Sequence, residues 1–282
     1  MKCLKESFVT LAMRKVSDGI GRPTDNVQIG IIDPDCRLIG LHFYVGLFKV
    51  IPFDNNGQLK EAFNIRLEEP EVLDIKFLYG CSKPTIVVLY QDNKDVHHVK
   101  TYEVVLEDKD FVEGPWSRNN LDNGPDLLIP VPPPPLCGVL IVGEETIVYC
   151  SANAFQTTQI DPSITKAYGR VDPDGSRYLL GDHMGLLSLL VIIHTNEKVT
   201  ELKIMPLGET SLASTISYLH RGFEYIVSSF GVICYFIRPP VSLQNLNRYT
   251  LIHHQEIAYY LTITEGKKEH ICFSKHLQYY CN

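Results

Sequence analysis

The grouping of short apolar runs in fours is the feature that most constrains the fold of this chain. Runs rich in Val, Ile, Leu, Tyr and Phe alternate with Gly, Pro, Asn and Asp, and helical periodicity is weak. The groups open near five positions, the fifth group being only partly recognisable: Ile29, Leu73, Leu127, Thr165 and Ser214. Four strands in every roughly 40 to 50 residues is the period of a β-propeller blade. A β-sandwich also has short, evenly spaced strands, but it does not regroup them in fours so naturally.

The order of polarity within each group supports this interpretation. The first run is the most apolar, which is typical of an inner strand buried on both faces, and charge collects later, as in "KTYEVVLEDKD". After Gly231 the grouping breaks, and we expect the remaining segment to complete no blade. The sequence therefore predicts an all-β fold, an incomplete β-propeller of four-stranded blades with an irregular C-terminal tail. The expected domains are an N-terminal extension over residues 1–17, a partial propeller over 18–231 and a divergent tail over 232–282.

Composition narrows the classes of partner. With 282 residues and 45% hydrophobic content, the chain can bury a sizeable core. Acidic residues outnumber basic ones by 33 to 26, for a formal charge of -7, so no global field attracts nucleic-acid phosphates or an anionic membrane. The N-terminal stretch "MKCLKESFVTLAMRKV" is too interrupted by charge for a secretory signal, and no apolar run reaches transmembrane length. We expect a soluble intracellular protein that binds no membrane.

The cysteines do not predict a disulfide framework or a metal site. Eight cysteines are scattered without regular spacing, mostly in apolar runs, and buried reduced thiols are the expected state. One group of metal-ligating residue types lies close together in the tail: His270, Cys272, His276 and Cys281. Its spacing does not match the paired-cysteine arrangements of zinc sites, so we expect no metal there.

No constellation of residues predicts catalysis. His97 and His98 are adjacent, so on a strand their rings point to opposite faces, and we expect surface positions for both. Asp33 with Asp35 is typical of a turn, and the Glu68-Glu69 pair before Pro70 is typical of a strand end. Neither a Gly-x-Ser-x-Gly elbow nor a histidine–glutamate metalloprotease motif occurs. We predict no catalytic residues and no cofactor.

Two further motifs favour structural roles. "DGIGRP" lacks the third glycine of a dinucleotide fingerprint and follows no strand, which favours a loop over a phosphate cradle. "PVPPPPL" joins two expected strands; it favours an inter-strand linker, with a polyproline ligand for an aromatic groove as the alternative.

Several stretches of the chain closely resemble one known family. They are "IGRPTDNVQIGIIDPDCRLIGLHFYVGLFKVIPFD", "AFNIRLEE", "DIKFLYGC", "HVKTYEV", "GPW", "RVDPDGSRYLLGD" and "LGETS". Together they resemble the large subunit of the damaged-DNA-binding protein, most closely its plant members, from about Asp18 to Gly231. That family is related to the large subunit of the cleavage and polyadenylation specificity factor and to a spliceosomal subunit. The resemblance implies an interior piece of the first of three propellers, without the family's opening blade.

The resemblance also implies partners and sites. Full-length members are adaptors that join substrate receptors to a cullin-RING ubiquitin ligase in nuclear DNA repair and protein turnover. Cullin attachment belongs to the second propeller, so we expect it to be absent here. Receptor docking uses a pocket between the first and third propellers, and the matching partner-binding positions are Leu187 and its neighbour Leu186, where the animal pattern has arginine. The implied location is the nucleus, possibly also the cytoplasm, and any nucleic acid would be contacted through a larger complex.

One hairpin departs from the family pattern. The family turn has Asp where this chain has Val45, in "YVGLFK". A β-branched residue tolerates the left-handed conformation poorly, at a cost on the order of 1 kcal/mol, so we expect a strained hairpin or an altered turn.

The residues and the resemblance together predict a non-enzymatic protein-interaction module. Two alternatives stay open: a nucleic-acid-binding propeller of the cleavage and polyadenylation factor type, and a propeller enzyme with a site at the central channel. The acidic balance disfavours the first, and the lack of catalytic motifs disfavours the second.

Overall fold

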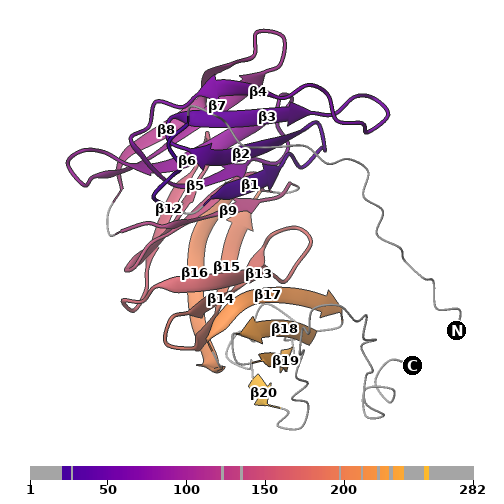
Figure 1. Cartoon of the computed structure of the whole chain (residues 1–282). Coiled ribbons are helices and arrows are strands. Elements are labelled where there is room, and N and C mark those ends of the chain that lie inside the picture. The colour runs from indigo at the N-terminus through magenta and orange to yellow at the C-terminus, as the bar shows by residue number, and fades with distance from the viewer. Residues whose placement is uncertain are drawn as a thin grey trace, which may run out of the picture.

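The structure is a computed structural model that describes residues 21–253, apart from 27, 122–123, 134–135, 197, 211, 221–222, 229–230 and 238–250. The described part is built of strands alone, arranged as five four-stranded antiparallel sheets (Figure 1). The first sheet contains β1 (Ile29–Ile32), β2 (Leu38–Tyr44), β3 (Leu47–Pro52) and β4 (Phe63–Arg66). The second contains β5 (Glu71–Phe77), β6 (Thr85–Gln91), β7 (His97–Val105) and β8 (Asp110–Leu121).

The remaining three sheets repeat the same sequential order of strands. The third contains β9 (Leu127–Val131), β10 (Gly138–Val142), β11 (Thr146–Cys150) and β12 (Phe155–Gln159). The fourth contains β13 (Thr165–Arg170), β14 (Arg177–Asp182), β15 (Leu186–Thr195) and β16 (Lys198–Glu209). The fifth contains β17 (Ala213–His220), β18 (Phe223–Ser228), β19 (Gly231–Ile237) and β20 (Leu251–His253). The predicted all-β fold of four-stranded blades is confirmed, and each predicted group opening lies within two residues of the start of its sheet.

The fifth sheet corrects one expectation. We expected the chain beyond Gly231 to complete no blade, but β19 pairs with β18 along its length and β20 pairs with β19. The run "GVICYFI" is apolar and β-branched enough to form a strand, although no regular grouping follows it. The expected tail ligands from His270 to Cys281 lie outside the described residues.

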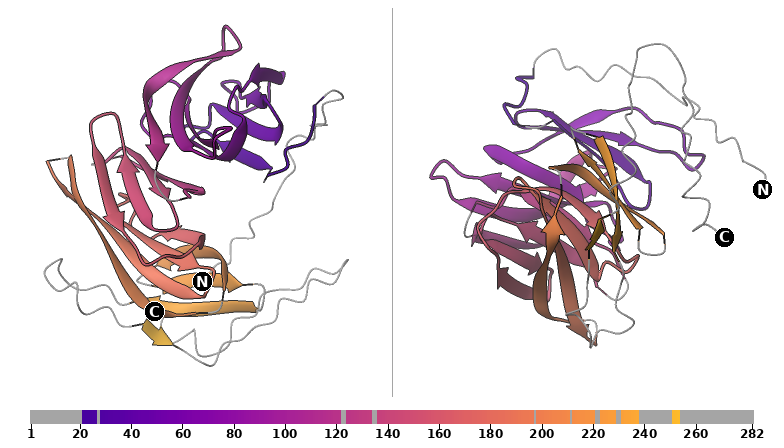
Figure 2. Two further views of the ribbon diagram at one scale, coloured as in Figure 1. Left: turned by 90° about the vertical axis from the view of Figure 1, so that its left-hand side faces the viewer. Right: turned by 90° about the horizontal axis from the view of Figure 1, so that it is seen from below.

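The core consists of four apolar clusters, one between each pair of successive sheets. Phe48 and Ile75 belong to the cluster between the first two sheets, and Leu89 and Val139 to the next. Tyr149 and Tyr178 lie between the third and fourth sheets, where both are almost fully buried. The fourth cluster joins the fourth sheet to β17 and β18. Sheets that pack face to face in sequence follow one another around an arc, as the two views of Figure 2 show.

A buried carboxylate ties the first strands of two sheets together. Asp74 on β5 accepts hydrogen bonds from the backbone N–H groups of Ile75 and of Leu128 on β9, at 2.8 and 2.9 Å. Burial raises the pKa of Asp74, and the ammonium of Lys76, 3.0 Å away, opposes that shift. These contacts satisfy a polar group that would otherwise be costly inside the sheet stack.

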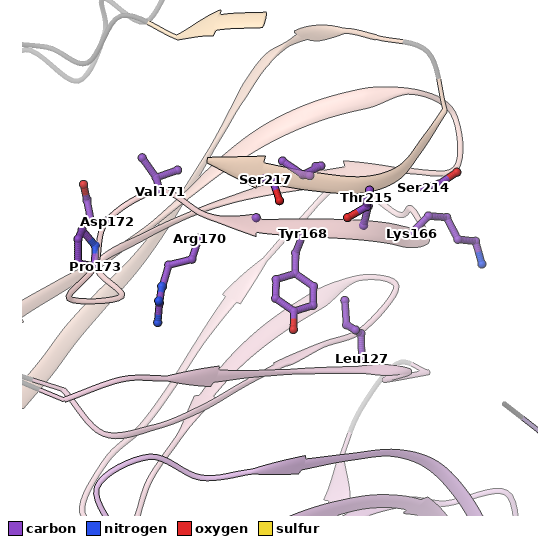
Figure 3. A pocket seen from close by; sticks show the side chains of 13 residues that line it. Leu127, Lys166, Tyr168, Arg170, Val171, Asp172, Pro173, Ser214, Thr215 and Ser217 are labelled. Atoms are coloured by element: carbon purple, nitrogen blue, oxygen red, sulfur yellow. The ribbon is translucent and has the colours of Figure 1, made fainter. Parts of the chain in front are cut away.

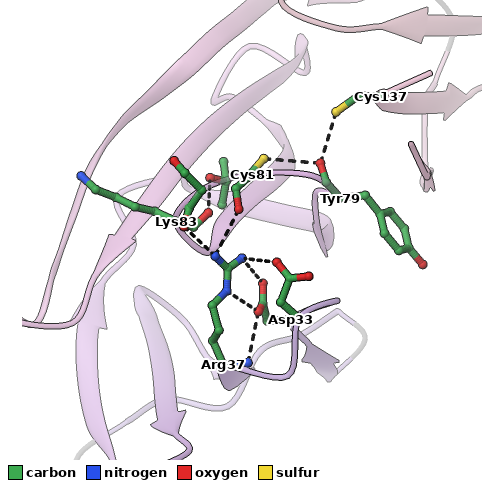
Figure 4. Close-up of polar contacts among 9 residues, drawn as sticks. Asp33, Arg37, Tyr79, Cys81, Lys83 and Cys137 are labelled. Carbon is green, nitrogen blue, oxygen red and sulfur yellow. Dashed lines mark hydrogen bonds and ion pairs between the residues drawn. The ribbon is translucent and has the colours of Figure 1, made fainter. Parts of the chain in front are cut away.

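Polar contacts at the loops join the first two sheets. Arg37 forms a paired ionic contact with Asp33, at 2.7 and 2.9 Å (Figure 4). It also donates to the carbonyl oxygens of Cys81 and Ser82, in the loop between β5 and β6 of the second sheet. The side-chain hydrogen bond to Asp33 is the main cause of the raised pKa of Arg37. Asp33 is 1% exposed, so this carboxylate has a structural role, which agrees with the expected turn.

The turn that contains Val45 is altered without strain at that residue. Val45 does not have a positive φ, whereas Gly46 does, at 73°. One positive φ at the second central residue is the pattern of a type II turn, which needs a glycine only there. The left-handed position falls on the glycine, so the β-branched residue is accommodated.

Candidate functional site

An open groove of about 630 Å³ runs along the first strands of the fourth and fifth sheets (Figure 3). In a propeller the first strand of each blade lines the central channel, so this is the position at which a channel site would form. The groove is lined by one residue of β9, the length of β13 with the loop after it, and the start of β17: Leu127, Lys166, Ala167, Tyr168, Gly169, Arg170, Val171, Asp172, Pro173, Ser214, Thr215, Ile216 and Ser217.

Side chains alternate along β13 and divide its two faces. Ala167 and Gly169 face the fifth sheet, where Gly169 lies against Ile216. Lys166, Tyr168 and Arg170 therefore share the opposite face. Figure 3 shows Tyr168 and Arg170 leaving the strand on the same side, with Tyr168 directed toward Leu127.

The acidic residue of the groove is held by an ion pair, whereas its two basic residues have no such partner in the described part of the chain. Asp172 is held by the guanidinium of Arg177, whose Nη2 lies 2.7 Å from Oδ1, and by the hydroxyl of Ser176. Burial alone would raise the pKa of Asp172, but these contacts outweigh it and the pKa is lowered. Among the described residues, Lys166 and Arg170 form no ion pair within 4 Å, although Lys166 lies close enough to the carboxyl group of Asp126 to oppose the rise of its pKa. Two cations without an ion-pair partner thus lie on one strand face of a protein with net negative charge.

The groove has hydroxyl groups but no recognisable catalytic group. Ser214, Thr215 and Ser217 contribute alcohol side chains from β17, and all three are exposed. The lining contains no His, Cys or Glu, and its single carboxylate, Asp172, is already bound to Arg177. The arrangement can bind a polar ligand, but no base lies in position to activate a hydroxyl.

The two predicted partner-binding residues are the first two residues of β15, directly after the turn that joins β14 to β15. Leu187 is 0% exposed and packs in the cluster between the fourth and fifth sheets, so its side chain is not accessible in this structure. Leu186 is partly exposed. Sequence reasoning missed Met184, which is 77% exposed at the tip of the same turn. The sequence could have indicated this exposed residue, because Met184 is an apolar residue at a turn between two apolar strands.

Asp182 shapes this turn. Its carboxylate Oδ1 accepts hydrogen bonds from the backbone N–H groups of Met184 and Leu186, at 2.9 and 2.8 Å. The turn backbone is thereby fixed while the Met184 side chain projects to solvent. Because Thr165 pairs with Asp182, the Lys166 end of the groove lies at this same end of the fourth sheet.

Two expectations about reactive residue types need correction. His98 is not a simple surface residue: its ring stacks on Tyr90 with centroids 5.1 Å apart, and its Nε2 lies 3.3 Å from Asp92. Among the four cysteines whose side chains the structure describes, only Cys150 is buried, whereas Cys36 and Cys137 are exposed, so the expectation of buried thiols does not hold for most of them. All four are free thiols.

Glu69 is likewise structural. It is 7% exposed and accepts a hydrogen bond from the hydroxyl of Tyr102. Burial is the main cause, and Glu69 the second, of the strongly raised pKa of Tyr102. The hydrogen bond from Tyr102 attaches the segment after β4 to the second sheet, so Glu69 has a structural role and does not form a reactive pair with Glu68.

The described residues contain no group of three or more His, Cys, Asp or Glu side chains that could hold a metal ion. A search of the same residues found no helix long and apolar enough to cross a membrane. The predictions of no metal and no cofactor stay predictions for the whole chain.

The repeated sheets and their stacking define a β-propeller domain of four-stranded blades. A family profile described as "RSE1/DDB1/CPSF1 first beta-propeller" matches residues 2–235. The chain therefore belongs to this family of first propellers.

Curated relatives agree with that assignment. Over 223 residues the chain is 79% identical to "DNA damage-binding protein 1" of Solanum lycopersicum, and over 224 residues it is 78% identical to "DNA damage-binding protein 1a" of Arabidopsis thaliana. The chain is also 74% identical, over 228 residues, to "DNA damage-binding protein 1" of Oryza sativa subsp. japonica. These alignments cover 79 to 80% of this chain but only 20 to 21% of each relative, so the chain spans about a fifth of their length.

Proposed function

We propose that this chain is a non-enzymatic protein-interaction module that binds substrate receptors of a cullin-RING ubiquitin ligase. Membership of the first-propeller family and 74 to 79% identity to DNA damage-binding proteins support this assignment. By the same comparison we propose action in DNA repair and protein ubiquitination, and location in the nucleus.

The turn between β14 and β15 is the single structural observation that carries the proposal. It presents Met184 and Leu186 on a backbone fixed by Asp182, next to the position predicted from the family pattern. A rigid turn with an exposed apolar tip is the kind of anchor that protein interfaces use, because little order is lost on binding. Leu187 would act beneath it, by packing β15 against the fifth sheet.

Binding of the full chain to a purified plant substrate receptor tests this proposal. We expect Met184→Asp and Leu186→Asp each to weaken binding by about tenfold or more, since anchor residues typically contribute more than 1 kcal/mol. Val112→Asp is the matched control, because Val112 is 50% exposed on β8 of the second sheet. Unchanged binding of both turn variants, or no binding by the folded parent chain, would refute the proposal.

A further inference from the structure

The groove along β13 plays no part in the protein-interaction proposal and differs from the rest of the chain in its charge. Its two cations, Lys166 and Arg170, are exposed, and neither forms an ion pair within the described residues. The chain as a whole carries a formal charge of -7. A local excess of positive charge inside a concave surface concentrates anions there, even when the whole protein repels them.

The spacing of the cations restricts the ligand. Lys166 and Arg170 are four residues apart on one strand face, so their Cα atoms are separated by about 13 Å. The Tyr168 side chain stands between them and reaches toward Leu127 (Figure 3). A ligand that contacts all three must carry negative charge and offer a flat or apolar part to the tyrosine ring.

The neighbouring strand β17, which lies beside the other face of β13, supplies neutral hydrogen-bond groups to the same groove. Ser214, Thr215 and Ser217 can each donate one hydrogen bond to an anionic oxygen. Arginine matches the planar arrangement of two phosphate oxygens, and lysine binds phosphate as a point charge. The volume of about 630 Å³ lies within the usual range of small-molecule sites.

We propose that this groove is a binding site for a phosphate-bearing small molecule with a flat ring, the chemistry of a mononucleotide. Arg170 and Lys166 contact the anionic groups, the hydroxyls of β17 complete the hydrogen bonds, and Tyr168 contacts the ring. Arg177 and Ser176 already hold the carboxylate of Asp172. Asp126 interacts electrostatically with Lys166 and reduces the positive charge at that end of the groove, so Arg170 is the main anion-binding residue. The site is one of binding alone, and no bond is made or broken in it.

Calorimetric titration of the full chain with adenosine 5′-diphosphate tests the proposal. Titrations with inorganic pyrophosphate and with adenosine measure the binding of the phosphate part and of the ring part separately. We expect the diphosphate to bind more tightly than either half. Lys166→Ala and Arg170→Ala should each weaken its binding by about tenfold, the usual effect of losing a hydrogen bond to a charged group. Tyr168→Leu should weaken binding of the nucleotide but not of pyrophosphate, and Tyr168→Phe should bind as the parent does.

Lys198→Ala is the matched control, because Lys198 is an exposed cation at the start of β16, outside the groove. Its affinity should stay within about twofold of the parent. Circular dichroism of each variant verifies that the fold is kept, which we expect because the substituted cations are exposed. Failure of the folded parent to bind the diphosphate, or equal loss in Lys198→Ala and Arg170→Ala, would overturn the site. Equal affinity for pyrophosphate and the diphosphate would overturn the role of Tyr168.

Discussion

His42 is an ionisable residue that the fold holds in its neutral form. The residue is 3% exposed, and Nδ1 lies 3.0 Å from the carbonyl oxygen of Leu47. A carbonyl can only accept, so Nδ1 carries the proton and donates. Burial lowers the pKa of His42 below its ordinary 6.5, and the hydrogen bond opposes that shift only in part. In this state the side chain fills the hairpin between β2 and β3 without bringing a charge into the sheet.

This burial predicts a loss of stability in mild acid. Because the pKa of His42 is lower in the folded than in the unfolded chain, its contribution is fully present above the unfolded value of 6.5 and is lost as pH falls below it. Between about pH 7.5 and about pH 5.5, we expect the melting temperature to drop less for His42→Gln than for the parent, because glutamine does not bind a proton in this range. The glutamine amide can still donate a hydrogen bond to the carbonyl oxygen of Leu47. His194→Gln, at a partly exposed position, should keep the parent's pH dependence; the same dependence in all three proteins would contradict the assignment.

At the scale of the elements, Gly169 sets how closely β13 approaches the fifth sheet. A Cβ atom placed there would lie 2.7 Å from Cγ2 of Ile216 and 3.0 Å from its backbone oxygen. Ile216 is 4% exposed, so it has little room to move away. The absent side chain thus lets the fourth cluster close and also fixes the position of the groove strand.

Gly169→Ala should therefore destabilise the protein. We expect the free energy of unfolding to fall by about 1 to 3 kcal/mol, the usual cost of overpacking a buried contact. Gly30→Ala on β1 is the control, because a Cβ there would meet only Cδ2 of Leu41, at 3.4 Å. Urea denaturation monitored by circular dichroism measures both variants. If Gly169→Ala is no less stable than Gly30→Ala, then the strand can shift and this contact does not determine the spacing.

Strand order was predictable from the sequence because it depends on local patterns. Apolar runs and turn residues repeat in fours, and the five sheets begin where those groups begin. The completion of the fifth sheet by β19 and β20 was missed because β20 lies far along the chain from β19, and no regular pattern links them. The groove was also missed, since Lys166 and Ser217 are brought together only by the stacking of sheets, which leaves no trace in spacing along the chain.

At the scale of the whole molecule, the first sheet has one face that none of the core clusters among the described residues includes. Alternation along β2 and β3 places His42 and Phe48 toward the second sheet, so Leu41, Phe43 and Leu47 lie on the other face. These three line a shallow hollow, and Ile32 on β1 of the same sheet is 60% exposed. In a closed propeller each blade packs between two neighbours, whereas the five described sheets form an open arc (Figure 2).

An apolar sheet face at the end of an arc predicts self-association of the isolated 282-residue chain. Leaving ~400 Å² of apolar surface in water forfeits roughly 10 kcal/mol, comparable to the net stability of a domain. We therefore expect a marginally stable chain whose apparent mass in light scattering after size-exclusion chromatography rises with concentration. The double variant Leu41→Lys with Phe43→Lys places charge on this face and should return the chain toward the monomer mass, whereas Val112→Lys on β8 should not. A parent chain that stays monomeric at all concentrations and melts cooperatively above about 55 °C, within the range of ordinary domains, would show that the face is covered and that the arc is stable by itself.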